Sequence, residues 1–131
     1  MPGKYILMLE NDNDDRYITQ STLRELNIFV PVRYEFYSPS LTSLLNEVPA
    51  LILVAYNAVT ADRLDIIEQF KSKNEYKKVP FVFLVEDISK EEIIKYYEAG
   101  ANTVIKKPSR DSDTRRKIEV FFKYWFEVAE L

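Results

Sequence analysis

The stretch that decides the fold is residues 5–15, YILMLENDNDD, in which an apolar run is followed at once by six carboxylate or amide side chains. Residues 5–9 are uncharged and long enough for one short strand, as expected for a strand covered on both faces of a sheet. The polar residues supply a loop, and Asp14 or Asp15 can cap a helix that runs to about Leu26. The stretch therefore predicts a strand, an acidic loop and a helix, in that order.

Four more apolar runs follow along the chain. The runs at residues 51–56, 81–85 and 103–105 are almost continuously apolar, whereas apolar and charged side chains alternate in residues 32–37. Continuous runs are typical of parallel strands buried on both faces, and alternation indicates a strand with one face toward solvent. We therefore expect five strands, with residues 32–37 at an edge of the sheet.

Helical patterns separate these runs. After Ser40, the apolar residues up to Val48 have the spacing of one side of a helix. Thr60 can cap a third helix, and we expect a last helix over about residues 113–130. Strict alternation of strand and helix is typical of an open parallel sheet with helices on both faces and right-handed crossovers. In such sheets the functional side chains lie beyond the carboxyl ends of the strands.

The helix before the fifth run has the clearest boundaries. Ser89 and Glu92 form a capping box at its start, and Ile94 and Tyr97 belong to its predicted apolar side. Gly100 lies where a left-handed residue would end the helix. We therefore expect a helix of about ten residues here.

Composition limits the chemistry that this chain can perform. It has no histidine, no cysteine and two glycines. Because histidine and cysteine supply most general bases near neutral pH, the thiolate nucleophiles and most zinc ligands, catalytic triads, thiol enzymes and zinc sites are excluded. Two glycines cannot build a glycine-rich phosphate cradle. Any chemistry must use carboxylates, lysine, tyrosine or hydroxyls, and any metal would be a hard cation such as Mg²⁺.

Size and charge limit the number of domains and the kinds of partner that we expect. The chain has 131 residues, of which 47% are hydrophobic, and we expect one domain with strand and helix repeats over about residues 4–130 and no separate output domain. The 21 acidic and 18 basic residues give no reason to expect nucleic-acid binding. No apolar run is long enough for a membrane span or a signal peptide, so no membrane partner and a cytoplasmic location are expected.

Four sequence features together resemble the receiver domain of two-component response regulators, of the chemotaxis-regulator kind. They are residues 6–12 with their acidic end, residues 79–80 before the fourth run, residues 98–102 before the fifth, and residues 107–108 after it. The resemblance extends over about residues 4–125. It implies a three-layer, doubly wound, flavodoxin-like α/β fold in which five parallel strands take the order 2-1-3-4-5.

The same resemblance implies where a phosphorylation pocket would lie. In the family, an aspartate after strand three accepts a phosphoryl group, and acidic residues after strand one hold Mg²⁺. A hydroxyl after strand four and a lysine after strand five bind the phosphoryl oxygens. In this chain these positions match Glu10 and Asn11, Ala55, Val85 and Lys107.

Three of these five positions depart from the family pattern. Asn11 lacks a carboxylate, Ala55 has no group that could accept a phosphoryl group, and Val85 has no hydroxyl. No aspartate or glutamate occurs in residues 48–61 to replace the missing nucleophile. The sequence therefore predicts a pseudo-receiver that is not an enzyme, is not phosphorylated at this position, and acts through protein–protein interaction.

Several alternatives remain open around this pocket. We favour an ion pair between Lys107 and Glu10, with phosphate binding by Lys107 as the alternative. A weak Mg²⁺ site could use Glu10 and the carbonyl of Asn57, and Asp12 could take a phosphoryl group instead. A small ligand could occupy a remodelled pocket beside Tyr56. Apart from this weak Mg²⁺ site, no cofactor is expected.

Aromatic residues indicate a candidate interaction surface. They make up 14% of the chain, and in the last helix Tyr124 and Phe126 point away from the predicted core side. Tyr96 is a further candidate, as is Val104, which replaces the family's aromatic switch residue in strand five. The alternative is that neighbouring loops cover the edges of the last helix. Expected partners are a histidine kinase, an output protein or a second copy of the chain.

Overall fold

A computed structural model describes most of the chain, namely residues 5–10, 13–38, 40–55, 60–85, 89–106 and 111–129. Within these ranges, one sheet is formed by five strands: β1 Ile6–Leu9, β2 Val32–Glu35, β3 Leu51–Val54, β4 Phe81–Val85 and β5 Thr103–Lys106. The strand order is β2-β1-β3-β4-β5 and each pairing is parallel, as predicted. This is the flavodoxin-like topology.

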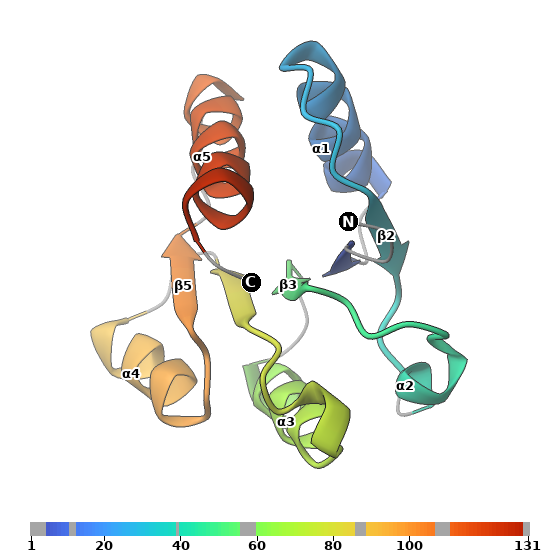
Figure 1. Ribbon diagram of the computed structural model, residues 1–131. Helices are drawn as coiled ribbons and strands as arrows, with labels where there is room; N and C mark the ends of the chain where they lie inside the picture. The colour runs from blue at the N-terminus through green and yellow to red at the C-terminus, as the bar shows by residue number, and fades with distance from the viewer. Residues whose placement is uncertain are drawn as a thin grey trace.

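Helices connect the strands on both sides of the sheet. They are α1 Asn13–Glu25, α2 Leu41–Leu44, α3 Thr60–Lys71, α4 Lys90–Glu98 and α5 Asp111–Lys123, with a 3-10 turn η1 at Asn74–Tyr76 and a π-helical turn η2 at Tyr124–Val128. Figure 1 shows α1 and α5 on one face of the sheet and α2, α3 and α4 on the other, which is the predicted three-layer arrangement. Among the described residues, no helix is long and apolar enough to cross a membrane.

Each face of the sheet has its own hydrophobic core, and β1 contributes side chains to both cores. Ile6 and Met8 belong to the core under α1 and α5, whereas Leu7 and Leu9 belong to the core under α3 and α4. Successive residues of a strand point to opposite faces, so a strand covered on both faces must be apolar at every position. All residues of β1 and β3 are buried. β2 lies at an edge of the sheet as predicted, but its exposure does not alternate, because Val32, Tyr34 and Glu35 are all partly buried and only Arg33 is exposed.

Helix bounds differ from the prediction in α1, α2, α3 and the last helix, which begins at Asp111 and changes at Tyr124 to the π-helical turn η2. α1 begins at Asn13, so Asp14 lies in its first turn, where a carboxylate complements the helix dipole instead of capping the helix. α3 includes Thr60 as its first residue. α2 ends at Leu44 although apolar spacing continued to Val48, because both side chains face solvent and Pro49 disfavours a helical residue before it.

The boundaries of α4 are as predicted. The Ser89 hydroxyl accepts a hydrogen bond from the Glu92 N–H at 3.2 Å, which caps the start of the helix. At its end, Gly100 has a φ of 116°, a conformation that residues with a Cβ rarely adopt. The helix therefore ends a few residues before β5 begins.

Candidate functional site

The candidate site lies at the carboxyl ends of the central strands. Glu10 follows β1, Ala55 follows β3 and Val85 ends β4. The other two predicted pocket residues, Asn11 and Lys107, lie outside the residues that the structure describes. The same holds for the residues of the open alternatives, Asp12, Tyr56 and Asn57.

Glu10 and Ala55 occupy neighbouring positions at this edge of the sheet. The register pairs Leu9 with Val54, one residue earlier on each strand, and the Ala55 N–H donates to the Leu9 carbonyl at 2.9 Å. Neighbouring strands lie about 4.8 Å apart. The structure therefore brings together the predicted metal-binding carboxylate and the position where a receiver carries its phosphoacceptor.

Glu10 is fully buried, with 0% of its surface exposed. A carboxylate at this depth is stable only when cations, hydrogen-bond donors or a metal compensate the loss of water. The position therefore suits either of the predicted roles, an ion pair with Lys107 or a ligand to Mg²⁺. Both remain predictions, because Lys107 and the acidic loop lie beyond the described ranges.

Arg16 is a residue of the site that the sequence analysis missed. From the first turns of α1, its guanidinium donates to the Glu10 carbonyl through Nε at 3.1 Å and Nη2 at 2.8 Å. The same group lies 4.6 Å from the centre of the Phe36 ring and 5.8 Å from that of Tyr34. Arg16 therefore joins the end of β1 to α1 and to the end of β2. The sequence signal was a single basic residue directly after the acidic loop.

Burial and the nearby Arg16 both change the pKa of the Tyr34 hydroxyl. Burial raises the pKa of its hydroxyl to about 12, and the nearby positive charge of Arg16 opposes this increase. The phenol is therefore neutral over the whole physiological range of pH. It serves as a partly buried ring beneath Arg16, with no acid–base role at the site.

Ala55 and Val85 make their part of the site apolar. Each is 1% exposed. Ala55 belongs to the core under α1 and α5, and Val85 belongs to the core under α3 and α4. An alanine side chain carries no nucleophile and a valine side chain carries no hydrogen-bond donor. Buried in this way, neither side chain lines an open pocket, which weakens the small-ligand alternative at this place.

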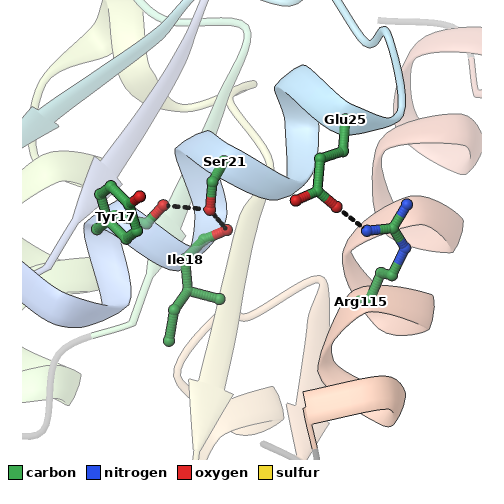
Figure 2. A network of polar contacts seen from close by, with 5 residues as sticks. All are labelled: Tyr17, Ile18, Ser21, Glu25 and Arg115. Carbon is green, nitrogen blue, oxygen red and sulfur yellow. Dashed lines mark hydrogen bonds and ion pairs between the residues drawn. The ribbon is translucent and has the colours of Figure 1, made fainter.

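α5 is attached to α1 by an ion pair between Arg115 and Glu25, shown in Figure 2. On α1, the Ser21 hydroxyl donates to the carbonyls of Tyr17 and Ile18, at 2.8 and 3.2 Å, one turn earlier. Exposed ion pairs of this kind contribute about 0–1 kcal/mol to stability. The side of α5 that carries Arg115 therefore faces α1.

Of the predicted interface residues on the last helix, Tyr124 is at the surface. Phe126 is partly buried, with its ring stacked on that of Phe122 at a centroid distance of 6.2 Å. The prediction of a surface position therefore holds for Tyr124 more fully than for Phe126.

The candidate Tyr96 is buried and was wrongly predicted as a surface residue. It is 1% exposed, and its ring centre lies 4.9 Å from that of Phe83 in the core under α4. Val104 is partly buried in the same core, and its backbone N–H donates to the hydroxyl of Tyr97 at 3.1 Å. It is therefore Tyr97, exposed on α4, that contacts β5 from outside.

A groove of about 780 Å³ runs between β5 and α5. Its apolar lining includes Ile105, Phe121 and Trp125, and its charged lining includes Arg116 and Lys117. The groove lies away from Glu10 and Ala55. Its lining is separate from the carboxyl ends of β1 and β3.

The strand order defines a flavodoxin-like α/β protein, in which a buried carboxylate follows the first strand. No protein-family model matches the chain. Similar sequences include response regulator Rcp1 of a Synechocystis species, 22% identical over 99% of this chain and 94% of that protein. Chemotaxis protein CheY1 of Helicobacter pylori is 23% identical over 88% of this chain and 94% of its own length.

Solved structures agree with these sequence relatives. A response regulator from Hahella chejuensis has a TM-score of 0.86 and 21% identity, with 98% of each chain covered. Sequence relatives and structural neighbours alike are thus response regulators and their receiver domains. In sequence and in fold, this chain is similar to response-regulator receiver domains over nearly its whole length.

Proposed function

We propose that this chain is a receiver-like signalling domain that acts by binding other proteins and is not switched by phosphorylation at position 55. The observation that carries the proposal is the buried Ala55 at the end of β3, next to Glu10. Phosphoryl transfer to a receiver needs a carboxylate nucleophile, a cation and hydrogen-bond donors. The first of these is absent from the chain at this position.

The electrostatics of the site support a domain that keeps one conformation. An aspartate beside Glu10 would place two carboxylates at neighbouring strand ends, where like charges raise each other's pKa and favour a bound cation. With alanine there, Glu10 has no such neighbour on β3, and one cation suffices to balance it. The apolar Val85 removes the hydroxyl that would follow a phosphoryl group. We therefore expect no catalytic turnover and little effect of Mg²⁺ on the conformation.

The partners in this proposal are proteins of a two-component pathway, a histidine kinase or an output protein. Support comes from the relatives, which are named as a response regulator and a chemotaxis protein. It also comes from the intact fold, because two well-packed cores are present although Ala55 and Val85 carry no reactive group. A domain that keeps the fold but lacks the phosphoacceptor is suited to binding.

Intact-mass measurement after incubation with acetyl phosphate and Mg²⁺ tests the proposal. A receiver domain that carries the phosphoacceptor aspartate serves as positive control. We expect no phosphate adduct on this chain and a full adduct on the control. A stoichiometric adduct would overturn the proposal, and fragmentation of the labelled protein would then show whether Asp12 carries the group.

A further inference from the structure

β2 is an edge strand, and one side of its backbone has no neighbouring strand. The strand order places β1 on its inner side and, among the described residues, no strand on its outer side (Figure 1). On the inner side, the Glu35 carbonyl accepts from the Glu10 N–H at 3.3 Å. Because successive residues of a strand direct their backbone groups to opposite sides, Val32 and Tyr34 direct their N–H and carbonyl groups outward.

The outer edge of β2 lacks the features that usually prevent another chain from pairing with an edge strand. Such features are a proline, a lysine or a bulge. Residues 32–36, VRYEF, contain neither proline nor lysine, and the register with β1 is unbroken from Val32 to Glu35. A hollow of about 310 Å³ adjoins Val32 and Arg33 at the start of the strand. Within the described part of the chain, this edge can therefore bind a strand of another chain.

The charges of β2 favour a second copy of the same strand as its partner. Arg33 and Glu35 lie two residues apart, hence on one face of the sheet, where they form an ion pair at 2.8 Å. When two β2 strands run antiparallel with Tyr34 opposite Tyr34, Arg33 of each copy lies opposite Glu35 of the other. Opposite charges in such positions attract each other, and like charges repel. A pairing centred on Arg33 or on Glu35 would instead place two like charges opposite each other.

The apolar face of β2 fits the same pairing. Val32 and Tyr34 pack against the core under α1 and α5, and Phe36, which directly follows β2, is 55% exposed. With Tyr34 on the two-fold axis, Phe36 of each copy lies opposite Val32 of the other. Aromatic and β-branched residues that face each other across a strand pair stabilise a sheet. The Phe36 ring is held beside the end of β2 by the Arg16 guanidinium, 4.6 Å from its centre.

We infer that this chain forms a two-fold dimer in which the outer edge of β2 pairs antiparallel with β2 of a second copy. The Tyr34 N–H of each copy donates to the Tyr34 carbonyl of the other, and Arg33 of each meets Glu35 of the other. The two sheets thus join into one, and each copy contributes the same surface. The dimer goes beyond the proposed function and does not depend on it, because β1 separates β2 from the strand that precedes Ala55.

Sedimentation velocity across a range of concentrations tests the dimer and its charge pairing. Arg33→Glu and Glu35→Arg each place like charges opposite each other twice, so each should raise the dissociation constant about tenfold or more. The two changes combined should restore the dimer, because opposite charges then meet again. The matched control is Arg24→Glu, the same change at an exposed position of α1, and circular dichroism checks folding. A monomer at all concentrations, a double variant as weak as the single ones, or an equal effect of the control would overturn the inference.

Amide hydrogen exchange, followed residue by residue, locates the contact on the backbone. The N–H groups of Arg33 and Glu35 face β1 in every state, whereas those of Val32 and Tyr34 are covered only in the dimer. Raising the protein concentration should slow exchange about tenfold or more at Val32 and Tyr34 and change it little at Arg33 and Glu35. A dimer without this pattern uses another surface and overturns the inference, as does protection that appears only when an unrelated extended peptide is added. Phosphate labelling of the same samples is independent of these results, so a failed dimer and a failed proposed function give different outcomes.

Discussion

Introducing the nucleophile of receiver domains by Ala55→Asp is the most informative perturbation of the site. The new carboxylate would enter a position that is 1% exposed and in contact with the core under α1 and α5. It would also lie one strand away from the fully buried Glu10. Both features oppose ionisation, because burial and a neighbouring carboxylate each raise the pKa of a carboxyl group.

The expected cost follows from these surroundings. Burying a neutral polar group without a hydrogen-bond partner costs about 1–3 kcal/mol, and an unpaired buried charge costs several kcal/mol. We therefore expect Ala55→Asp to lower the free energy of unfolding by about 2–4 kcal/mol at pH 8. A small domain has about 5–15 kcal/mol to lose, so the variant should still fold.

The comparison with Ala55→Asn isolates the contribution of charge. Both variants add a side chain of similar size, but only the carboxylate ionises. Because its pKa is raised in the folded state, its cost should grow as pH rises above the ordinary carboxyl value and vanish below it. Urea unfolding at pH 3 and pH 8 should show the two variants equal at the lower pH and Ala55→Asp about 1–2 kcal/mol less stable at the higher pH.

Phosphorylation of the same variant completes the test. With Asn11 and Val85 unchanged, we expect at most slight labelling by acetyl phosphate and Mg²⁺, because a nucleophile without its full metal site is poorly activated. Fast, stoichiometric labelling together with equal stability of the two variants at pH 8 would refute the reasoning. The pocket would then be polar and ready for a metal, in contrast to the apolar site described above.

Three further predictions concern stability. Relative to Tyr34→Phe, the unmodified chain should lose about 1 kcal/mol of unfolding free energy between pH 9 and pH 11, because the raised pKa of Tyr34 keeps the folded phenol neutral while the unfolded phenol ionises; parallel curves would contradict this. Gly100→Ala should cost about 1–2 kcal/mol in thermal unfolding, because a Cβ at a φ of 116° is strained and would lie 3.4 Å from Ile67 Cγ2; an unchanged melting temperature would contradict it. Ser89→Ala should cost about 1 kcal/mol in urea unfolding through the lost cap, while Ser89→Asp, which keeps an acceptor for the Glu92 N–H, should cost little.

Strands could be predicted from the sequence better than helices, for a physical reason. A parallel strand covered on both faces has to be apolar at each position, and β1 and β3 show this without exception. A helix end depends on local competition that spacing does not reveal. Leu44, the last residue of α2, and Val48 have helical spacing, yet both face solvent, so no core contact of these residues extends α2 to Val48.

The positions of the site could be predicted because each directly follows a strand, whereas its contacts could not. Arg16 binds a backbone carbonyl after β1 and a ring after β2, and only the folded chain brings these together. On α4, apolar spacing favoured Tyr97 as a core residue and Tyr96 as a surface residue. In the structure Tyr96 is buried and Tyr97 is exposed. Adjacent residues differ by about 100° around a helix, and Ile93 and Ile94 one turn earlier are both apolar, so spacing alone does not decide which tyrosine faces the core.

The number of residues in the π-helical turn η2 determines which side chains lie on the outer surface of the last helix. The Ala129 N–H donates to the carbonyl of Tyr124, five residues earlier, at 2.7 Å. Such a turn holds more residues than an α-helical turn, so it rotates less per residue, and Val128 stays nearly in line with Tyr124. In an α-helix, four residues would carry Val128 about 40° past that line. Removing one residue from this turn would bring Ala129 into the place of Val128. A related chain that differs here by a single deletion could therefore keep the whole core and still present a different face to its partners.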